Sequence, residues 1–167
     1  AFGPAHDGWS HVASDQGGTR WDAPYVAAID ADGRIVLAGQ IETQTSYDIG
    51  IARLLPDGAL DATFGGNGRL QTGFDLGGHN WDTAHSLFVR PDRHILLGGQ
   101  TQSNGTVGIA VMLRPDGSFE HRFGDAGLFA LTDPDGPESG VLSAQRMVLD
   151  GDYMYMTGSI INPGVLP

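Results

Sequence analysis

The sequence predicts an all-β protein built from repeated antiparallel units, and three observations support this prediction. Related segments recur about every sixty residues along the 167-residue chain, which is the signature of a repeat architecture. Short apolar runs are separated by Asp-Gly and Gly-rich segments, which contain the residues that tight hairpins require. No long run has apolar residues at helical spacing, so strands are expected throughout.

The repeat consists of a Phe-Gly pair, a Gly-Gly-x-x-Trp-Asp loop, an apolar strand and a Pro-Asp-Gly turn in constant order. These features lie at residues 2–3, 64–65 and 123–124 (pair), 17–22 and 77–82 (loop), 35–40, 95–100 and 154–159 (strand), and 56–58 and 115–117 (turn). The third copy of the strand is the most divergent. We therefore expect one structural domain with a first repeat at 1–63, a second at 64–122 and a partial third at 123–167.

Each complete copy contains four candidate strands. They lie near residues 9–14, 25–30, 34–41 and 48–55 in the first copy, and near 69–74, 86–90, 94–101 and 107–114 in the second. The third candidate strand of each copy is apolar almost throughout, which indicates burial on both faces. Four antiparallel strands per repeat are typical of β-propeller blades, and a blade buries both faces only by stacking against neighbours. The predicted fold is therefore a β-propeller-type array of four-stranded antiparallel blades.

The number of repeats is too small for a closed ring. Closed propellers use about four to eight blades, whereas this chain has about three repeats, the third of them incomplete. Such an incomplete ring would expose unpaired strand edges and bare apolar faces. The chain is therefore expected to belong to a longer propeller, to pair with another chain, or to associate with a copy of itself. A two-fold dimer would close a ring, so we expect the isolated chain not to be a monomer.

Two runs of the first copy resemble the delta-sixty repeat, a family found mostly in bacterial surface and secreted proteins. They are Asp-Gly-Arg-Ile-Val-Leu-Ala-Gly at residues 32–39 and Pro-Asp-Gly-Ala-Leu-Asp-Ala-Thr-Phe-Gly at residues 56–65, with Asp48, Ala52 and Arg53 between them. The second copy departs from the pattern, with Arg93 at the turn glycine and Met112 at the arginine. The resemblance implies a propeller-like fold and a secreted, periplasmic or cell-surface location in a bacterium. The family carries no established reaction.

The composition argues against several functions. The formal net charge is −11 and all nine basic residues are arginine, so the acidic surface would repel nucleic-acid phosphates. The apolar runs are too short to span a bilayer as helices, and we expect neither nucleic-acid binding nor membrane insertion. Cysteine is absent, which excludes disulfides, thiolate metal sites and cysteine nucleophiles. The chain begins with Ala1 rather than Met, so Ala1 is either a processed N-terminus or the start of an excised segment, and we favour an exported and processed protein.

The duplicated Gly-Gly-x-x-Trp-Asp loop carries the candidate ligand-binding residues Trp21, Asp22, Trp81 and Asp82. Aromatic rings can stack on the apolar face of a sugar while carboxylates accept its hydroxyl hydrogens, so these residues would suit glycan recognition. In the structural alternative, each Trp packs between blades and each Asp caps its loop through backbone amides. Repeated residues in repeat proteins usually serve packing, and we favour this alternative.

A second candidate site is an acidic segment that contains Asp133, Asp135 and Glu138. Calcium prefers several oxygen ligands from a short loop, and Asp-x-Asp-Gly resembles the opening of such loops. The complete calcium-loop pattern is absent, however, and two prolines in the segment fit an ordinary turn. Calcium is the one cofactor that the sequence raises, and the turn is the favoured interpretation.

The sequence favours a non-catalytic binding or assembly module that contacts protein or glycan through its loop faces. The alternative is part of a propeller hydrolase that acts on a glycan or lactone with carboxylates in the central channel. No serine lies in a Gly-x-Ser-x-Gly elbow, and the six histidines lack metal-ligand spacing. An enzyme requires polar groups that differ between blades and converge, whereas the polar loop residues here repeat. Arg53 is expected to pair with a carboxylate of its blade rather than to act in catalysis.

Overall fold

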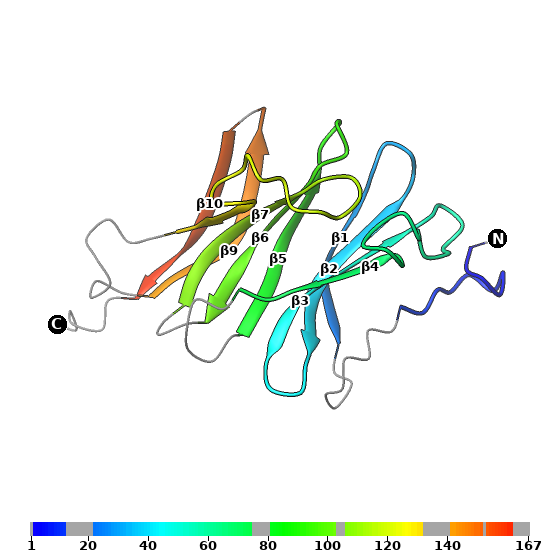
Figure 1. The fold of residues 1–167 in the computed structure, drawn as a ribbon, viewed down its shortest axis with the longest axis horizontal. Coiled ribbons are helices and arrows are strands. Elements are labelled where there is room, and N and C mark those ends of the chain that lie inside the picture. Colours follow the sequence, from blue (N-terminus) through cyan, green and yellow to red (C-terminus); the bar gives the residue numbers. More distant parts are fainter. Residues whose placement is uncertain are drawn as a thin grey trace.

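A computed structural model describes residues 2–12, 22–74, 81–102, 106–131, 141–151 and 153–161. These residues form ten β-strands and no helix, which confirms the predicted all-β class (Figure 1). None of the described segments could therefore cross a membrane as a helix. The strands are arranged in three consecutive units that follow one another along the long axis of the molecule (Figure 1).

The first two units have the same strand order. The first contains β1 (Ala23–Ile29), β2 (Ile35–Glu42), β3 (Tyr47–Leu54) and β4 (Arg69–Thr72), and the second contains β5 (Trp81–Val89), β6 (Ile95–Gln102), β7 (Thr106–Leu113) and β8 (Leu128–Ala130). Consecutive strands within each unit pair antiparallel. A parallel bridge between Tyr47 and Trp81 joins the two units into one eight-stranded sheet. The third unit is the hairpin of β9 (Val141–Asp150) and β10 (Tyr153–Ile161).

The sequence repeat and the structural unit are out of step. The strand expected to open the second copy near residues 69–74 is β4, which pairs with β3 and completes the first unit. The strand expected near residues 9–14 is absent from the described part of that range, 9–12. The repeat boundaries at residues 63 and 122 fall between the third and fourth strands of a unit. The Phe-Gly pair that marks each copy therefore lies inside a unit and not between units.

The turns between strands place glycine in the left-handed backbone region. Gly33 in the turn after β1 has a φ of 77°, and Gly58 and Gly117 in the Pro-Asp-Gly turns have φ of 88° and 90°. Residues with a Cβ rarely adopt such angles. Arg93 stands at the position of Gly33 in the second unit and still adopts a φ of 68°. The hairpin therefore keeps its geometry despite the substitution.

Two apolar layers hold the three units together. The layer between the first and second units has the buried members Val36, Ala38, Ile49, Ile51, Phe64, Phe74, Ala84, Leu87, Ile95, Leu97, Ile109, Val111 and Leu113. The layer between the second and third units centres on Leu96, Ala110 and Met147. Leu96 and Leu97 point to opposite faces of β6 and enter different layers. Burial of this apolar strand on both faces, which the sequence predicts, is confirmed.

Residues 2–12 contact the first unit in the same way that the Phe-Gly loop of the first unit contacts the second. Gly3 donates its N–H to Asp57 O at 2.7 Å, and Gly65 donates its N–H to Asp116 O at 2.9 Å. Both acceptors belong to the aspartate of a Pro-Asp-Gly turn. The same contact between loop and turn therefore occurs twice along the array.

The hydrogen bonds within the N-terminal segment also repeat those of the first unit. Gly8 donates its N–H to Phe2 O at 2.9 Å, and Gly68 donates to Phe64 O at 2.7 Å across a loop that is two residues shorter. In the first unit, the residue that follows this glycine begins β4. Residues 9–12 therefore take the place of an outermost fourth strand, and none of the described strands pairs with them.

Candidate functional site

The predicted ligand-binding residues of the second loop make structural contacts. Trp81 begins β5 and packs edge-on against Tyr47 of the first unit, with 5.1 Å between the ring centroids. Asp82 is fully buried, and its Oδ2 accepts the N–H of Phe74 at 2.7 Å. These are the contacts of the structural alternative, in which the Trp packs between units and the Asp caps its loop. Because half of the Trp81 side chain is exposed, a role in glycan binding stays a prediction.

The other predicted site residues do not join Trp81 and Asp82 in one described site. Asp22 lies on the first unit, where it borders an apolar cleft. Four of the predicted residues lie outside the described part of the chain, namely Trp21, Asp133, Asp135 and Glu138. Within the described part, no group of three or more His, Asp or Glu side chains could hold a metal ion. The calcium prediction at the acidic segment stays untested.

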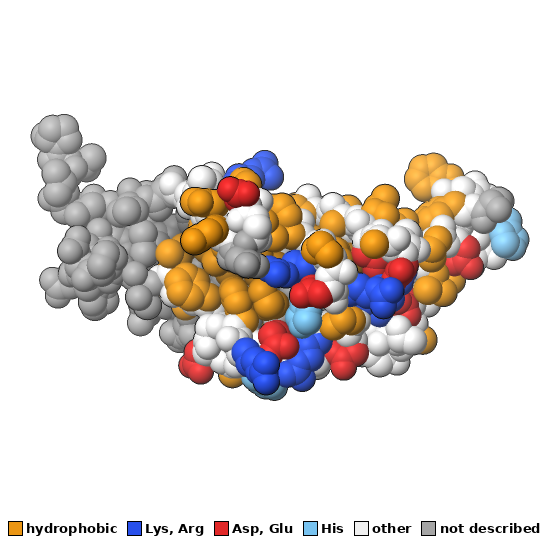
Figure 2. Space-filling view, turned by 90° about the horizontal axis from the view of Figure 1, so that it is seen from above, with side chains coloured by type: hydrophobic (Ala, Val, Ile, Leu, Met, Phe, Trp, Pro, Cys, Tyr) orange, Lys and Arg blue, Asp and Glu red, His pale blue; other side chains and the backbone are white. Residues whose placement is uncertain are grey.

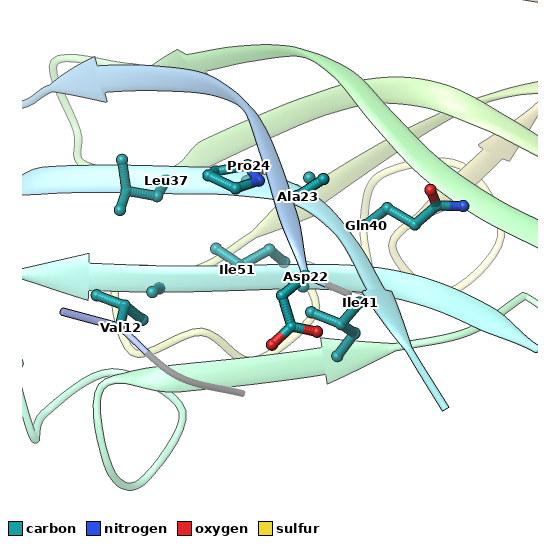
Figure 3. Close-up of a pocket in the computed structure, with 12 residues that line it drawn as sticks. Val12, Asp22, Ala23, Pro24, Leu37, Gln40, Ile41 and Ile51 are labelled. Atoms are coloured by element: carbon teal, nitrogen blue, oxygen red, sulfur yellow. The ribbon is translucent and has the colours of Figure 1, made fainter. Parts of the chain in front are cut away.

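One face of the first unit forms a shallow apolar cleft of about 70 Å³ (Figure 3). Its lining includes Leu37 and Ile41 from β2, Ala52 from β3, Pro24 from β1 and Val12 from the N-terminal segment. Apart from Val12, these side chains come from adjacent strands of one sheet, so the cleft is a sheet face and not an enclosed cavity. We call this surface the outer face of the first unit.

The equivalent face of the second unit is covered. Leu97 corresponds to Leu37 in the repeat and is only 1% exposed, because side chains of the first unit pack against it. Ala27, the cross-strand neighbour of Leu37, is exposed, whereas Leu87, the neighbour of Leu97, is buried to a residual exposure of 9%. The two faces carry similar apolar side chains and differ in whether a neighbouring unit covers them.

The opposite end of the array also exposes apolar side chains. On the third unit, Val148, Tyr153 and Tyr155 have exposed fractions of 56%, 71% and 55%. They alternate along β9 and β10 with side chains such as Met147 and Met154, which pack against the second unit. Each end of the array therefore exposes a sheet face of the kind that is buried in its interior.

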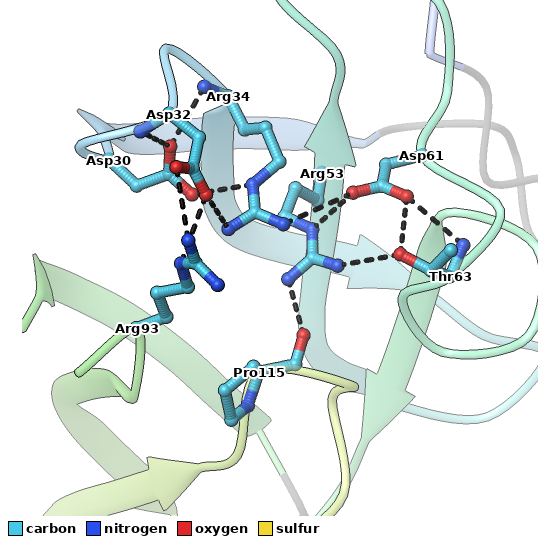
Figure 4. A network of polar contacts seen from close by, with 8 residues as sticks. All are labelled: Asp30, Asp32, Arg34, Arg53, Asp61, Thr63, Arg93 and Pro115. Atoms are coloured by element: carbon cyan, nitrogen blue, oxygen red, sulfur yellow. Dashed lines mark hydrogen bonds and ion pairs between the residues drawn. The ribbon is translucent and has the colours of Figure 1, made fainter.

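A buried arginine crosses from the first unit to the second (Figure 4). Arg53 on β3 is 2% exposed, and its Nε donates to Asp61 Oδ2 at 2.8 Å. Its other guanidinium nitrogens donate to Thr63 Oγ1 at 3.1 Å and to Pro115 O. The expected pairing of Arg53 with a carboxylate is thereby confirmed. Because Pro115 belongs to the second unit, this arginine also fixes one unit against the other.

The carboxylates around this arginine are held in the ionised state. Burial alone would raise the pKa of Asp61, but hydrogen bonds from Thr63 and Arg53 hold that pKa below its ordinary value. Burial also opposes ionisation of Asp30, whose pKa is nevertheless lowered by backbone and side-chain hydrogen bonds from Arg34. Figure 2 shows acidic and basic side chains gathered together on one face of the molecule. The polar groups here stabilise one another and hold both carboxylates in their charged form.

The second unit replaces this arrangement with a different one. Met112 stands at the position of the buried arginine and packs against the apolar layer between the second and third units. Glu120 stands at the position of its carboxylate partner and lies 3.2 Å from Arg114 Nε and 3.4 Å from His94 Nε2. Hydrogen bonds from the Arg114 side chain and from the backbone N–H of Arg122 lower the pKa of Glu120 to about 2. The unit therefore keeps an ion pair but moves it toward the surface.

A site that sequence reasoning missed lies along the first strands of the three units. Each of these strands, β1, β5 and β9, has a β-bulge at the same register, and the bulged residues are Tyr25, His85 and Gln145. They line a cleft of about 430 Å³ together with Gln100 and Arg146. We call this site the bulge cleft. Its sequence signal is the recurrence of polar or aromatic side chains at a spacing of about sixty residues, which follows the repeat.

The bulge cleft combines groups of different chemistry. Burial and the positive charge of Arg146 lower the pKa of His85, so its imidazole is largely neutral at neutral pH. The Tyr25 and His85 rings lie 6.1 Å apart with a tilt of 30°, and the Tyr25 hydroxyl lies 3.3 Å from Gln40 Oε1. A cation, a neutral imidazole, amide groups and an aromatic ring are thus available to one ligand.

Comparison with known proteins supports the class of fold. Residues 31–64 match a family described as a domain of unknown function (DUF5122) beta-propeller. The matched segment contains β2, β3 and the loop that carries Asp61 and Thr63, so it includes most of the buried arginine's partners. A search of curated proteins found no match to the sequence. The β-propeller description agrees with the predicted type of fold, whereas the resemblance to the delta-sixty repeat stays a prediction.

Proposed function

We propose that this chain is a non-catalytic binding and assembly module of a β-propeller, in which its three units are successive blades of a larger ring. The observation that carries the proposal is the pair of apolar faces at the two ends of the array, which expose side chains such as Ile29 and Tyr155 and which none of the described units covers. Propellers bury such faces by stacking four-stranded sheets around an axis. The β-propeller description of the family that matches residues 31–64 supports the same architecture.

The outer face of the first unit fits another blade of the same repeat. The first unit covers the second, and Gly65 of the first unit donates its N–H to the carbonyl of Asp116 in the second. The equivalent contact of Gly3 with Asp57 gives residues 2–12 the role of closing loop and outermost strand of a blade that covers the first unit. The other three strands of that blade would lie over Leu37 and its neighbours.

For the isolated chain, we propose that the third unit of a second copy covers this face. Tyr155 on β10 corresponds in the repeat to Val36 on β2. Val36 is fully buried because its face packs against the next unit, whereas Tyr155 is 55% exposed. The face around Tyr155 therefore corresponds to the face of the first unit that packs against the second. Two such head-to-tail contacts would close a two-fold ring.

Light scattering at micromolar concentration tests this assembly. We expect a mass of two chains or more, and the mass of a single chain would contradict the proposal. Leu37→Glu and Tyr155→Glu should each give a monomer, because each places a charge in one of the two contacting faces. Phe129→Glu is the matched control, since Phe129 is an exposed apolar residue outside both faces, and it should leave the mass unchanged. Loss of association in the control as well would contradict the assigned contact.

The binding part of the proposal is contact with protein or glycan through loops at one end of the blades. Trp81 supports it, because the residue is 49% exposed while its ring packs edge-on against Tyr47. We also propose a secreted, periplasmic or cell-surface location in a bacterium, and the sequence resemblance alone supports this part of the proposal. The hydrolase alternative needs carboxylates that are available to a substrate in a central channel, whereas the buried carboxylates Asp61 and Asp82 are held by contacts within the fold. We therefore favour binding.

A further inference from the structure

The bulge cleft differs in charge from the chain as a whole. The protein has a formal net charge of −11, yet the side chains that line the cleft include a guanidinium group and no carboxylate. Among the described residues, Arg146 takes part in none of the ion pairs. Its donors therefore remain available, and an available arginine in a cleft without carboxylates is suited to an anion.

The cleft is also built from residues that converge although they come from three units. A β-bulge inserts one extra residue into a strand and redirects its side chain. The bulges fall at one register in β1, β5 and β9, so Tyr25, His85 and Gln145 line the same cleft. The repeat places these residues together but does not make them alike. Converging groups that differ in chemistry indicate a specific ligand, whereas repeated groups indicate a scaffold.

The lining groups match a compact ligand that carries both hydroxyl groups and a carboxylate. Arg146 can donate two parallel hydrogen bonds to a carboxylate. The neutral imidazole of His85 and the amides of Gln100 and Gln145 offer the donors and acceptors that hydroxyl groups need. Tyr25 is 47% exposed, and its ring can cover the apolar face of a sugar ring. The volume of about 430 Å³ lies within the usual range of small-molecule sites.

We propose that the bulge cleft binds a sugar acid, a hydroxylated ring that carries a carboxylate, with Arg146 on the carboxylate and Tyr25 on the ring. The inference rests on the glycan-binding part of the proposed function, for which it names the ligand class and the site. It does not depend on ring closure, because every residue that lines the cleft belongs to one chain.

Titration with glucuronate and with glucose, followed by NMR, is the direct test. The two sugars differ in that a carboxylate replaces a hydroxymethyl group, so the pair isolates the contribution of the charge. We expect glucuronate to bind roughly ten-fold or more tightly than glucose and to shift the imidazole resonances of His85. Equal affinities, or the absence of any shift at millimolar glucuronate, would overturn the proposal.

Variants locate the site. Arg146→Gln should weaken glucuronate binding roughly ten-fold or more. Arg122→Gln is the matched control, because it removes the same charge from an exposed position outside the cleft, and it should leave the affinity unchanged. Tyr25→Ala should weaken the binding of both sugars, and it provides a second readout if Arg146→Gln does not fold. Equal weakening by Arg146→Gln and Arg122→Gln would show that net charge alone attracts the ligand.

Light scattering on the same samples separates this inference from the proposed assembly. A chain that associates but does not bind glucuronate would overturn the sugar-acid site and leave the assembly standing. A monomeric chain that binds glucuronate through Arg146 would support the site and contradict the assembly.

Discussion

The first and second units have the same strand order and similar apolar strands, yet they bury their equivalent faces to different degrees. Leu97 in the second unit is 1% exposed, whereas Leu37 at the same position of the first unit is partly exposed. The difference comes from the neighbour and not from the strand, because the first unit covers the second and none of the described units covers the first. The same apolar strand can therefore form part of a buried layer between units or remain a surface on which another unit could pack.

The two units differ in a second way, at the position of Arg53 and Met112. Arg53 reaches the backbone of the next unit at Pro115 and pairs with the buried Asp61. Met112 instead joins the apolar layer that the third unit completes. The same position thus attaches one unit to the next either by a buried ion pair or by apolar packing. Substitutions at these positions measure how much the buried ion pair and the apolar packing each contribute to stability.

The largest effect is expected for Arg53→Met, which gives the first unit the residue of the second. It leaves the Asp61 carboxylate buried without its cation, and breaking a buried pair in this way costs about 3–5 kcal/mol in the free energy of unfolding. The double variant Arg53→Met/Asp61→Asn should regain part of this loss, because no buried charge remains. Urea unfolding measures both. A cost of less than about 1 kcal/mol for the single variant would show that the pair contributes no more than a surface salt bridge.

A smaller but more direct contrast is expected between Leu97→Ala and Leu37→Ala. Leu97→Ala should cost about 2–5 kcal/mol, because it opens a cavity between two units. In a monomeric background such as Tyr155→Glu, Leu37→Ala should cost about 1 kcal/mol or less, since its face is already in contact with water. Urea unfolding in parallel gives the comparison. Similar costs for the two variants in that background would contradict the uncovered state of the first face.

The smallest effect concerns pH and Glu120. Its folded pKa of about 2 lies below the unfolded value of about 4.3. A carboxyl group with a depressed pKa contributes stability above the unfolded pKa, and this contribution is lost as the pH falls toward the folded value. The urea midpoint should therefore decrease between about pH 5 and pH 2, and Glu120→Gln should reduce that decrease. The lowered pKa values of Asp30 and Asp61 predict that part of the decrease remains. An identical pH profile for wild type and Glu120→Gln would exclude a contribution from this ion pair.

The elements that the sequence predicts well are those whose signal is local. The apolar run of β6 predicts a strand buried on both faces. Asp32-Gly33 marks the hairpin between β1 and β2, and Asp57-Gly58 marks the turn that follows β3. The pairing of Arg53 with a carboxylate follows from a single arginine among the apolar residues 49–54. In each of these cases the residues that decide the structure lie within a few positions of one another.

The elements that the sequence does not predict depend on contacts between distant residues. The assignment of β4 to the first unit depends on pairing with β3 across the intervening Phe-Gly loop, and the repeat period alone does not determine where a unit ends. The bulge cleft is missed because a bulge is a property of register between two strands. In the sequence, His85 does not lie at a spacing typical of metal ligands or catalytic residues. Most of its neighbours in the cleft come from the other two units.

The proposed assembly requires that another unit of the same repeat covers the outer face of the first unit and pairs with residues 9–12. A chain in which a copy of residues 22–63 stands directly before Phe2 would supply the strands of that unit. Hydrogen exchange of the backbone amides of residues 9–12 then gives the answer. If that unit covers the face, the exchange of these amides should slow to the range of the equivalent residues Arg69–Thr72 in β4. Exchange as fast as in the unextended chain would contradict the proposed assembly.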